Sequence, residues 1–259
     1  MAIVSLLSDF GVADPWVGVM KARVLAQAPS ASLVDLTHAV PPGDVRAGAF
    51  LLAQAFAWFP EGSVHLAVVD PGVGTRRRAI AVEAGGAFFV GPDNGLFALA
   101  LAGRRVRRAV VLPVPPRASP TFHGRDVFAP AAGRLAAGTS IESLGRPAGR
   151  LRALDWPRPR RRGADTVGEI VHVDHFGNLV TNLRTVDRGE LVAGNSFRTR
   201  RILRTYGDAH HGEPLALRGS HGFLEIAVRD GSAAAQLGLA RGDKILVRHR
   251  IFKRHRGSV

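Results

Sequence analysis

A stretch rich in arginine and proline divides this sequence into two parts whose hydrophobic patterns differ. Residues 144–162, LGRPAGRLRALDWPRPRRR, contain seven arginines and three prolines. Before this stretch, strand-like apolar runs alternate with helical spacing, whereas the runs after it are short and alternate between apolar and polar residues. Because proline lacks an amide hydrogen and interrupts regular structure, we expect a linker at residues 146–164. It would join an α/β domain, residues 1–145, to a β domain, residues 165–259.

The first part predicts a Rossmann-like α/β sheet domain. Strand and helix signals alternate along it, as they do in folds that pack helices on a largely parallel sheet. Two of the apolar runs end at an aspartate, Asp9 and Asp70, and in such sheets ligands bind beyond the carboxyl ends of the strands. The predicted elements are strands at 2–10, 31–36, 63–70, 78–84, 86–91 and 109–114, with helices at 16–28, 45–59, 94–101 and 125–137.

The second part predicts a small antiparallel β-barrel domain. Its apolar runs are short, rich in β-branched residues and separated by glycine and aspartate. We expect strands at residues 166–174, 178–183, 200–206, 214–219, 222–228 and 244–250.

The composition excludes several classes of protein. Apolar residues make up 46% and charged residues 22% of the chain, a balance typical of a folded globular protein. The longest apolar segment, residues 47–59, contains Gln54 and is too short for a membrane span. The start, MAIVSLLSDF, lacks the basic region of a signal peptide. Because cysteine is absent, disulfides and thiolate metal sites are excluded, and we expect a cytoplasmic protein that does not associate with a membrane.

A net charge of +14 suggests nucleic acid as a partner. However, the only lysines are Lys21, Lys244 and Lys253, so the charge reflects a general use of arginine. No helix-turn-helix, RNA-recognition or zinc module is visible, and one tyrosine offers little for base stacking. A basic nucleic-acid-binding protein is an alternative that the sequence does not favour.

The segment VVDPGVGTRRR, residues 68–78, places a carboxylate on a glycine-rich bend before three arginines. It lacks the GK[ST] ending of a P-loop, and no third glycine completes a dinucleotide-binding motif. Taken alone, Asp70 is typical of a turn residue before proline, and His123 of a partly buried structural histidine. The two phosphate-binding motifs are therefore excluded, and the carboxylate needs another explanation.

Five segments follow one another along the chain: LLSDFGVADPWVGVMKA, VVDPGVGTRRR, GPDNGLF, TFHGRD and HVDHFGNLVTN. In that order and spacing, from Ser5 to about Leu246, the chain resembles the S-adenosyl-L-methionine hydrolases, the adenosine-forming hydroxide adenosyltransferases related to fluorinases and chlorinases. The resemblance implies hydrolysis of S-adenosyl-L-methionine to adenosine and L-methionine, by attack of water or hydroxide on the ribose 5′ carbon. It implies no metal and no cofactor besides the substrate. It also implies a homotrimer with active sites at the subunit interfaces.

The resemblance gives the hydrolytic role to Asp70, Arg77 and His123. A carboxylate and an imidazole can orient a water molecule and accept its proton, while an arginine can hold the carboxylate bidentately. Which of Asp70 and His123 takes the proton stays open at this point. We expect the flanking Arg76 and Arg78 to be solvated.

Substrate-binding positions carry over as well. Asp9 matches a carboxylate that binds the ribose diol, with helix capping as the alternative. Asp14 and Asp174 match positions near the methionine moiety. Asn94 is either a turn residue or a direct contact. Two polar contacts and an aromatic residue that stacks on adenine complete the set in the second part, at Asn178, Ser220 and Tyr206.

The sequence departs from the family in two places. Residues 229–234, RDGSAA, replace an asparagine-rich stretch, and His221 stands where a halogenase would carry arginine. A halogenase is the nearest alternative, but a carboxylate about 4 Å from a halide would cost roughly 4 kcal/mol at an effective dielectric constant of about 20. The neighbouring His210 and His211 have no partner at ligand spacing, so we expect solvated loop histidines and no metal site.

Overall fold

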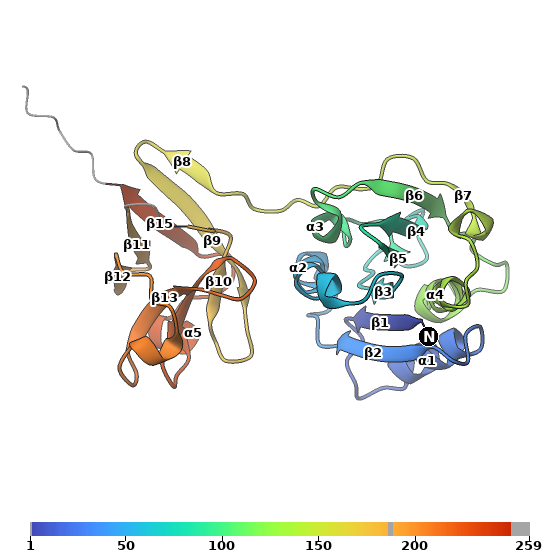
Figure 1. The fold of residues 1–259 in the computed structure, drawn as a ribbon, viewed down its shortest axis with the longest axis horizontal. Coiled ribbons are helices and arrows are strands. Elements are labelled where there is room, and N and C mark those ends of the chain that lie inside the picture. The colour runs from blue at the N-terminus through green and yellow to red at the C-terminus, as the bar shows by residue number, and fades with distance from the viewer. Residues whose placement is uncertain (1, 186–188, 250–259) are drawn as a thin grey trace, which may run out of the picture. The chain divides into compact units, whose positions relative to one another are not determined.

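The computed structural model describes residues 2–185 and 189–249, which fall into two compact units, residues 1–155 and 156–259 (Figure 1). The division lies inside the arginine- and proline-rich stretch. One end of that stretch forms strand β7 (Arg146–Pro147) in the first sheet, and the other forms β8 (Arg160–Arg162) in the second. Residues 148–159, between these two strands, contain neither helix nor strand.

The first unit is built on a seven-stranded mixed sheet in the order β2-β1-β3-β5-β4-β6-β7. Strands β2, β1, β3 and β5 pair in parallel, whereas β4, β6 and β7 pair antiparallel. This arrangement confirms the predicted α/β class. The remaining strands are β1 (Ile3–Ser8), β2 (Ser32–Thr37), β3 (Val64–Val68), β4 (Ala79–Ala84), β5 (Ala87–Pro92) and β6 (Val106–Val111).

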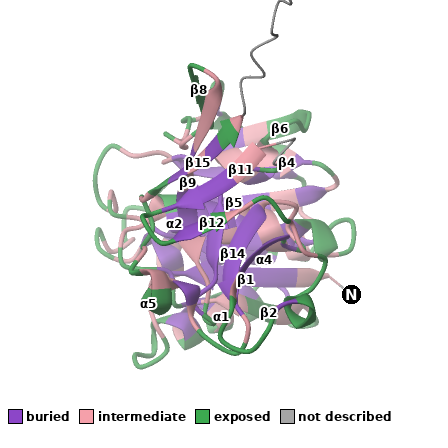
Figure 2. Cartoon of the chain, turned by 90° about the vertical axis from the view of Figure 1, so that its left-hand side faces the viewer, coloured by how far each residue is buried: buried purple, intermediate pink, exposed green. Residues whose placement is uncertain are grey.

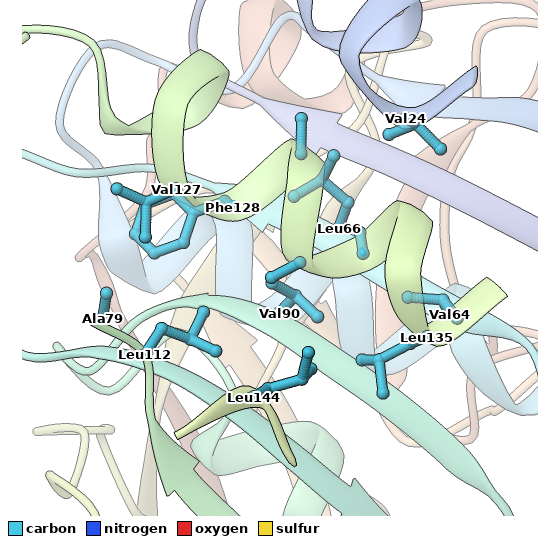
Figure 3. Close-up of a cluster of buried hydrophobic side chains, with 14 of the residues drawn as sticks. Val24, Val64, Leu66, Ala79, Val90, Leu112, Val127, Phe128, Leu135 and Leu144 are labelled. Carbon is cyan, nitrogen blue, oxygen red and sulfur yellow. The ribbon is translucent and has the colours of Figure 1, made fainter. Parts of the chain in front are cut away.

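Helices cover both faces of this sheet. One face packs against α1 and α4 through a core that includes Val24, Leu66 and Phe128 (Figure 3). The other packs against α2 and α3 through a core that includes Leu52 and Phe89. Burial of these apolar side chains on both faces is the main force that holds the layers together. The helices are α1 (Trp16–Leu25), α2 (Val45–Ala55), α3 (Ala98–Leu101) and α4 (Ala129–Ala136).

The helices of the first unit are shorter than the sequence patterns predicted. Helix α3 begins at Ala98 instead of residue 94, because Gly95 has φ +99° and the segment 93–97 turns. Helix α4 begins at Ala129, and the preceding residues Gly124–Phe128 form a π-helical turn, closed by a bond from Ala129 N to Gly124 O. The spacing of apolar residues in these turns resembles that in an α-helix, so the sequence pattern did not distinguish the turns from the helices that follow them. No helix among the described residues is long and apolar enough to cross a membrane.

The second unit is an antiparallel, nearly barrel-shaped sheet in the order β12-β11-β15-β9-β10-β14-β13, with β8 paired to β9, which confirms the predicted fold. Strand β14 is buried at every position (Figure 2). Besides β8, the second unit contains β9 (Asp165–Val173), β10 (Leu179–Thr181), β11 (Gly189–Ala193), β12 (Phe197–Thr199), β13 (Pro214–Arg218), β14 (Leu224–Val228), α5 (Ala233–Leu237) and β15 (Lys244–His249).

One predicted strand of this unit is wrong. Residues 200–206 form an irregular segment with a single bridge, Leu203 to Leu217, followed by a short turn, Tyr206–Asp208. The turn forms because the Thr205 and Asp208 side chains cap it reciprocally, and such a local hydrogen-bonded motif competes with strand pairing. The predicted strand at 244–250 ends at His249 in the described structure, and residues 250–259 lie outside the described residues.

Candidate functional site

The loop after strand β3 carries Asp70 and Arg77. A tight turn forms where Val73 N donates to Asp70 O at 3.2 Å, and the Thr75 hydroxyl donates to Gly72 O at 2.7 Å. Gly74 has φ +75°, and a Cβ atom there would lie 2.5 Å from Pro120 O. Glycine at position 74 therefore allows this loop to touch the segment that leads to His123. Gly72 has no positive φ and only ordinary contacts, so a need for glycine is visible at Gly74 and not at Gly72.

Asp70, Arg77 and His123 are brought together by this contact between loops. Arg77 Nε donates to Asp70 Oδ1 at 3.0 Å, and Arg77 Nη2 donates to Asp70 Oδ2. The same Nη2 lies 3.1 Å from His123 Nδ1. The Asp70 and Arg77 side chains are only 5% and 7% exposed, so the pair is a buried bidentate ion pair. A guanidinium has no acceptor atom, so His123 Nδ1 must accept, and neutral His123 then carries its proton on Nε2.

Burial shifts the pKa values of Asp70 and His123. It raises the pKa of Asp70 above its usual value, and the charge of Arg77 opposes this rise. Burial, followed by the charge of Arg77, lowers the pKa of His123. The Arg77 guanidinium also lies over the Phe128 ring, 5.3 Å from its centre. Arg77 Nη1 is buried and bonds to no acceptor among the described residues.

A cavity of about 370 Å³ adjoins the trio at the carboxyl ends of β1 and β3. Asp9, Asp70 and His123 contribute to its lining, together with Phe10 and Phe122. Asp9 Oδ2 accepts a bond from Gly43 N at 2.8 Å. Asp9 is not the cap of either nearby helix, because no side chain caps the N-terminus of α1 and Asp44 caps that of α2. The sequence-based expectation that ligands would meet this edge of the sheet agrees with the position of the cavity.

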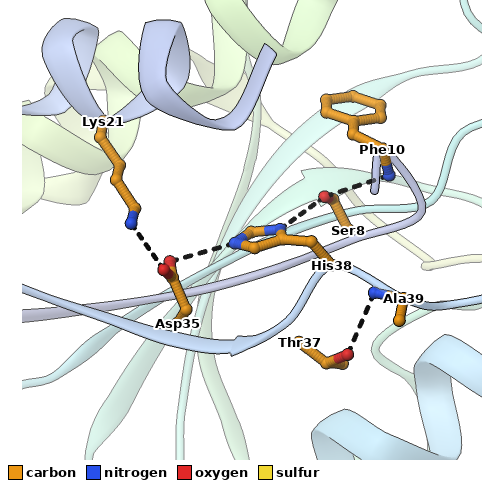
Figure 4. Close-up of polar contacts among 7 residues, drawn as sticks. All are labelled: Ser8, Phe10, Lys21, Asp35, Thr37, His38 and Ala39. Carbon is orange, nitrogen blue, oxygen red and sulfur yellow. Dashed lines mark hydrogen bonds and ion pairs between the residues drawn. The ribbon is translucent and has the colours of Figure 1, made fainter. Parts of the chain in front are cut away.

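A buried histidine braces the turn that carries Asp9 (Figure 4). His38 Nδ1 lies 2.7 Å from Ser8 Oγ, and His38 Nε2 lies 3.0 Å from Asp35 Oδ1. Ser8 Oγ also accepts from Phe10 N at 3.3 Å. Sequence reasoning missed this network, and the only signal for it was a serine at the end of one strand and a histidine after the next.

The second unit has its own cavity, of about 700 Å³, lined by Asp174, Asn178 and Tyr206 among others. The Asp174 carboxylate closes the loop around it. Its Oδ1 accepts from Phe176 N at 2.9 Å and from Asn178 N at 2.8 Å, while Oδ2 accepts from Asn178 Nδ2 at 2.9 Å. Asp174 thus shapes the cavity wall, and Asn178, which also lines the cavity, is buried.

The segment that departs from the family pattern forms another wall of this cavity. Arg229 donates to the carbonyl oxygens of Gly207 and Ala209, at 3.2 and 2.7 Å. Asp230 has φ +58°, a conformation that aspartate tolerates better than most residues. Its carboxylate pairs with His211 Nδ1 at 2.5 Å. His211 is therefore exposed but paired, where simple solvation was expected.

Several predicted positions lie outside both cavities. Asp14 and Ser220 are exposed and line neither one. Asn94 Nδ2 donates to Val69 O at 2.8 Å, so its side chain supports the chain just before Asp70. Arg76 is exposed, as expected. Within residues 2–185 and 189–249 no three His, Asp or Glu side chains are grouped as a metal site.

Arg78 is partly exposed but firmly paired, whereas a solvated side chain was expected. Its Nε donates to Asp93 Oδ2 at 2.8 Å, and its terminal nitrogens donate to the carbonyl oxygens of Ala148 and Arg150. Asp93 in turn accepts from Arg152 N at 2.8 Å. The ion pair of Arg78 and Asp93 thus binds residues 148–152, near the end of the first unit, to its sheet. The local sequence does not reveal this contact, because the segments are far apart in the chain.

The chain matches both domain models of one family: the SAM hydroxide adenosyltransferase N-terminal domain over residues 4–145, and the C-terminal domain over residues 168–246. An (R)-S-adenosyl-L-methionine hydrolase of Thermus thermophilus is 46% identical over 254 residues, 93% of this chain and 98% of the relative. One of Salinispora tropica is 43% identical over 260 residues, 94% and 97% of the two chains. A fluorinase of Nocardia brasiliensis is 28% identical over 292 residues, 95% and 96%.

Solved structures also resemble this chain. The crystal structure of an uncharacterized conserved protein from Thermotoga maritima has a TM-score of 0.88 and 34% identity, and the match covers 95% of this chain and 100% of that one. A conserved hypothetical protein from Thermus thermophilus has a TM-score of 0.80 and 45% identity, with the same coverage.

Proposed function

Since the chain belongs to the SAM hydroxide adenosyltransferase family, we propose that it hydrolyses S-adenosyl-L-methionine to adenosine and L-methionine. The observation that carries this proposal is the buried trio Asp70, Arg77 and His123 beside a cavity lined by Asp9. Relatives at 43–46% identity over most of the chain bear the hydrolase name, which supports the same reaction.

The reaction requires activation of water more than activation of the leaving group. The sulfonium departs as a neutral thioether, so the electron pair of the C5′–S bond leaves with methionine without a general acid. Water attacks C5′ and loses one proton, which a positioned base must accept. We propose Asp70 as that base, because its pKa is raised and His123 Nδ1 is held by Arg77. His123 Nε2 would then donate to the water oxygen and orient it in line with the bond that breaks.

Halide transfer is disfavoured by charge. A halide at the position of the water would face the Asp70 carboxylate, and repulsion at about 4 Å would cost roughly 4 kcal/mol. The fluorinase of Nocardia brasiliensis is also a more distant relative, at 28% identity, than the hydrolases.

A direct assay tests the proposal. Purified protein is incubated with each sulfonium epimer of S-adenosyl-L-methionine, and adenosine and methionine are quantified against a protein-free control. We expect equal amounts of both products, with the (R) epimer preferred, as the names of the relatives specify. We further propose that no metal takes part, so a chelator should leave the rate unchanged. Tight binding of substrate without turnover would contradict a hydrolase.

We also propose a homotrimer in which each site combines the first unit of one subunit with the second unit of another. The support is that each unit carries a cavity of its own, one beside Asp9 and the other beside Tyr206. Mixing an Asp9→Ala chain with a Tyr206→Ala chain should restore part of the activity that each has lost. A fully active monomer in sedimentation would contradict this proposal.

A cytoplasmic location, proposed from the lack of cysteine, is tested by cell fractionation.

A further inference from the structure

A buried carboxylate, Glu225, lies one hydrogen bond away from the cavity of the second unit. It belongs to β14, whose five residues are all buried, and its side chain is 5% exposed. A carboxylate is costly to bury unless its oxygens are hydrogen-bonded or paired. An acid inside the apolar run LEIAV therefore calls for a role.

Each carboxylate oxygen of Glu225 holds a different segment of the chain. Oε1 accepts a bond of 2.6 Å from the hydroxyl of Tyr206, whose ring lines the cavity. Oε2 lies 3.3 Å from Nε2 of His221, in the turn that precedes β14. Neither partner is a permanent cation, so within the part of the chain that the structure describes Glu225 forms no arginine or lysine ion pair.

The backbone at Gly219 leaves room for the His221 and Glu225 side chains. A Cβ atom at Gly219 would lie 2.5 Å from His221 Cε1 and 2.7 Å from Glu225 Oε2. Glycine at 219 therefore leaves space for the imidazole and the carboxylate against the main chain. Burial and then the contact with Glu225 raise the pKa of Tyr206, as expected for a phenol that donates to an anion.

We propose that Glu225 is a positioning residue that holds the Tyr206 ring in place as a wall of the cavity before substrate binds. The inference rests on the proposed function, because the group that the ring would contact is the purine base of the substrate. Ordering the ring in advance lowers the entropy lost on association, so Glu225 should act on affinity. The chemical step takes place at the trio in the first unit and should not depend on it.

Four variants test this role. Glu225→Leu removes both acceptors, Glu225→Gln keeps one, and Tyr206→Phe removes the donor but keeps the ring. Glu190→Gln is the control, because Glu190 is likewise a strand glutamate of the second unit, but its side chain is partly exposed and pairs with Arg200 away from this cavity. For each variant, kcat and KM for S-adenosyl-L-methionine, the Kd for adenosine by calorimetry, and the Tm are measured.

We expect Glu225→Leu to raise KM and the adenosine Kd about tenfold, the scale of one lost hydrogen bond to a charged group, with kcat nearly unchanged. Glu225→Gln should have a smaller effect, and it should add nothing to the effect of Tyr206→Phe. A purely structural role would lower Tm without this split between KM and kcat. Because Tyr206 is the only tyrosine, tyrosinate absorbance reports it alone, and Glu225→Gln should lower the pH at which it ionises.

Two results would overturn the inference. One is a Glu225→Leu protein that binds adenosine as tightly as the Glu190→Gln control. The other is a double variant of Tyr206→Phe and Glu225→Gln in which the two effects on KM multiply as independent changes. The second comparison decides the matter even when Glu225→Leu fails to fold. A wild-type protein that binds adenosine with the expected pattern but forms no product would contradict the proposed hydrolysis and leave this inference standing.

Discussion

The ion pair between Asp70 and Arg77 shows how single residues acquire unusual properties through burial. Both side chains are almost fully enclosed, and both ends of the guanidinium edge meet the carboxylate. Removal of one member of such a buried pair leaves the other without compensation, which is costly. The rigid pair also fixes where His123 Nδ1 lies, since Arg77 contacts both groups.

Replacement of Asp70 by asparagine should separate binding from chemistry. The amide keeps the size of the side chain but removes the charge, so water loses its proton acceptor. We expect turnover to fall by about 100-fold or more, as for a lost general base. Affinity for S-adenosyl-L-methionine, measured by calorimetry, should change much less, because Asp9 and the second cavity are intact. Lost binding with surviving single-turnover chemistry would instead mean that Asp70 holds the sulfonium by charge.

The pH dependence of hydrolysis should have an acidic limb only. Water activation needs ionised Asp70 and neutral His123, and protonation of either group on acidification stops the reaction. The pKa of His123 is lowered from 6.5, so the loss due to this residue should lie below pH 6.5. The carboxylate of Asp126 opposes this lowering, so Asp126→Asn should move the His123 part of the limb to still lower pH. A limb centred above pH 6.5 would contradict a neutral, buried His123.

At the scale of elements, the site depends on contacts between loops that follow different strands. The loop after β3 meets the 120–123 segment where Gly74 lies against Pro120 and where Arg77 contacts His123. The turn after β1 is braced from β2 through His38. The carboxyl ends of β1 and β3 form the edge of the sheet at which the site lies. The contacts between loops set the distances between the side chains of the site.

Gly74→Ala tests the loop contact. The added Cβ would lie 2.5 Å from Pro120 O at φ +75°, so the two loops must separate and His123 must move from Arg77. We expect turnover to fall at least about tenfold, because misplacement by an ångström can cost this much or more. Gly103→Ala is the control, since Gly103 has φ +72° but nothing within 4 Å. Thermal melts and kcat should show lost stability of about 1 kcal/mol for both, from backbone strain, but lost turnover only for Gly74→Ala. Equal kcat values would contradict the role of the loop contact.

At the scale of the whole molecule, a buried histidine makes the stability of the core depend on pH. His65 on β3 bonds through Nδ1 to Ser5 Oγ at 2.7 Å and lies among the rings of Phe56, Phe59 and Phe89. Burial lowers its pKa to about 4, from 6.5. Because the charged form is disfavoured inside the fold, the first unit is most stable when His65 is neutral.

The unfolding free energy should therefore fall as the pH decreases. The unfolded chain binds the His65 proton below pH 6.5, whereas the folded chain resists until about pH 4, so stability is complete above 6.5 and is lost between these values. The shift corresponds to a loss on the order of 3 kcal/mol. Urea unfolding at several pH values checks this, with His65→Leu as the comparison. A variant with the same pH dependence as the wild type would show that other groups cause it.

The fold class and much of the element order could be predicted from the sequence because periodicity is a local property, although strands β8, β11 and β12 were not predicted. Alternating apolar runs indicated the α/β sheet, and the change of period after residue 144 indicated the barrel. Local hydrogen bonding caused the main error, since the capped turn at Tyr206–Asp208 replaced a predicted strand. The segments that carry Asp70, Arg77 and His123 were recognisable because each motif is contiguous.

The contacts that build the sites were decided by the tertiary structure alone. Arg78 with Asp93, Ser8 with His38, and Tyr206 with Glu225 each join residues that lie 15 to 30 positions apart in the sequence. Asp14 and Ser220, matched by motif, line neither cavity. A sequence pattern reports which residues neighbour one another along a strand or helix, and a motif reports residue types. Neither reports which side chains from separate segments meet, because that depends on how the packed core positions the ends of its strands.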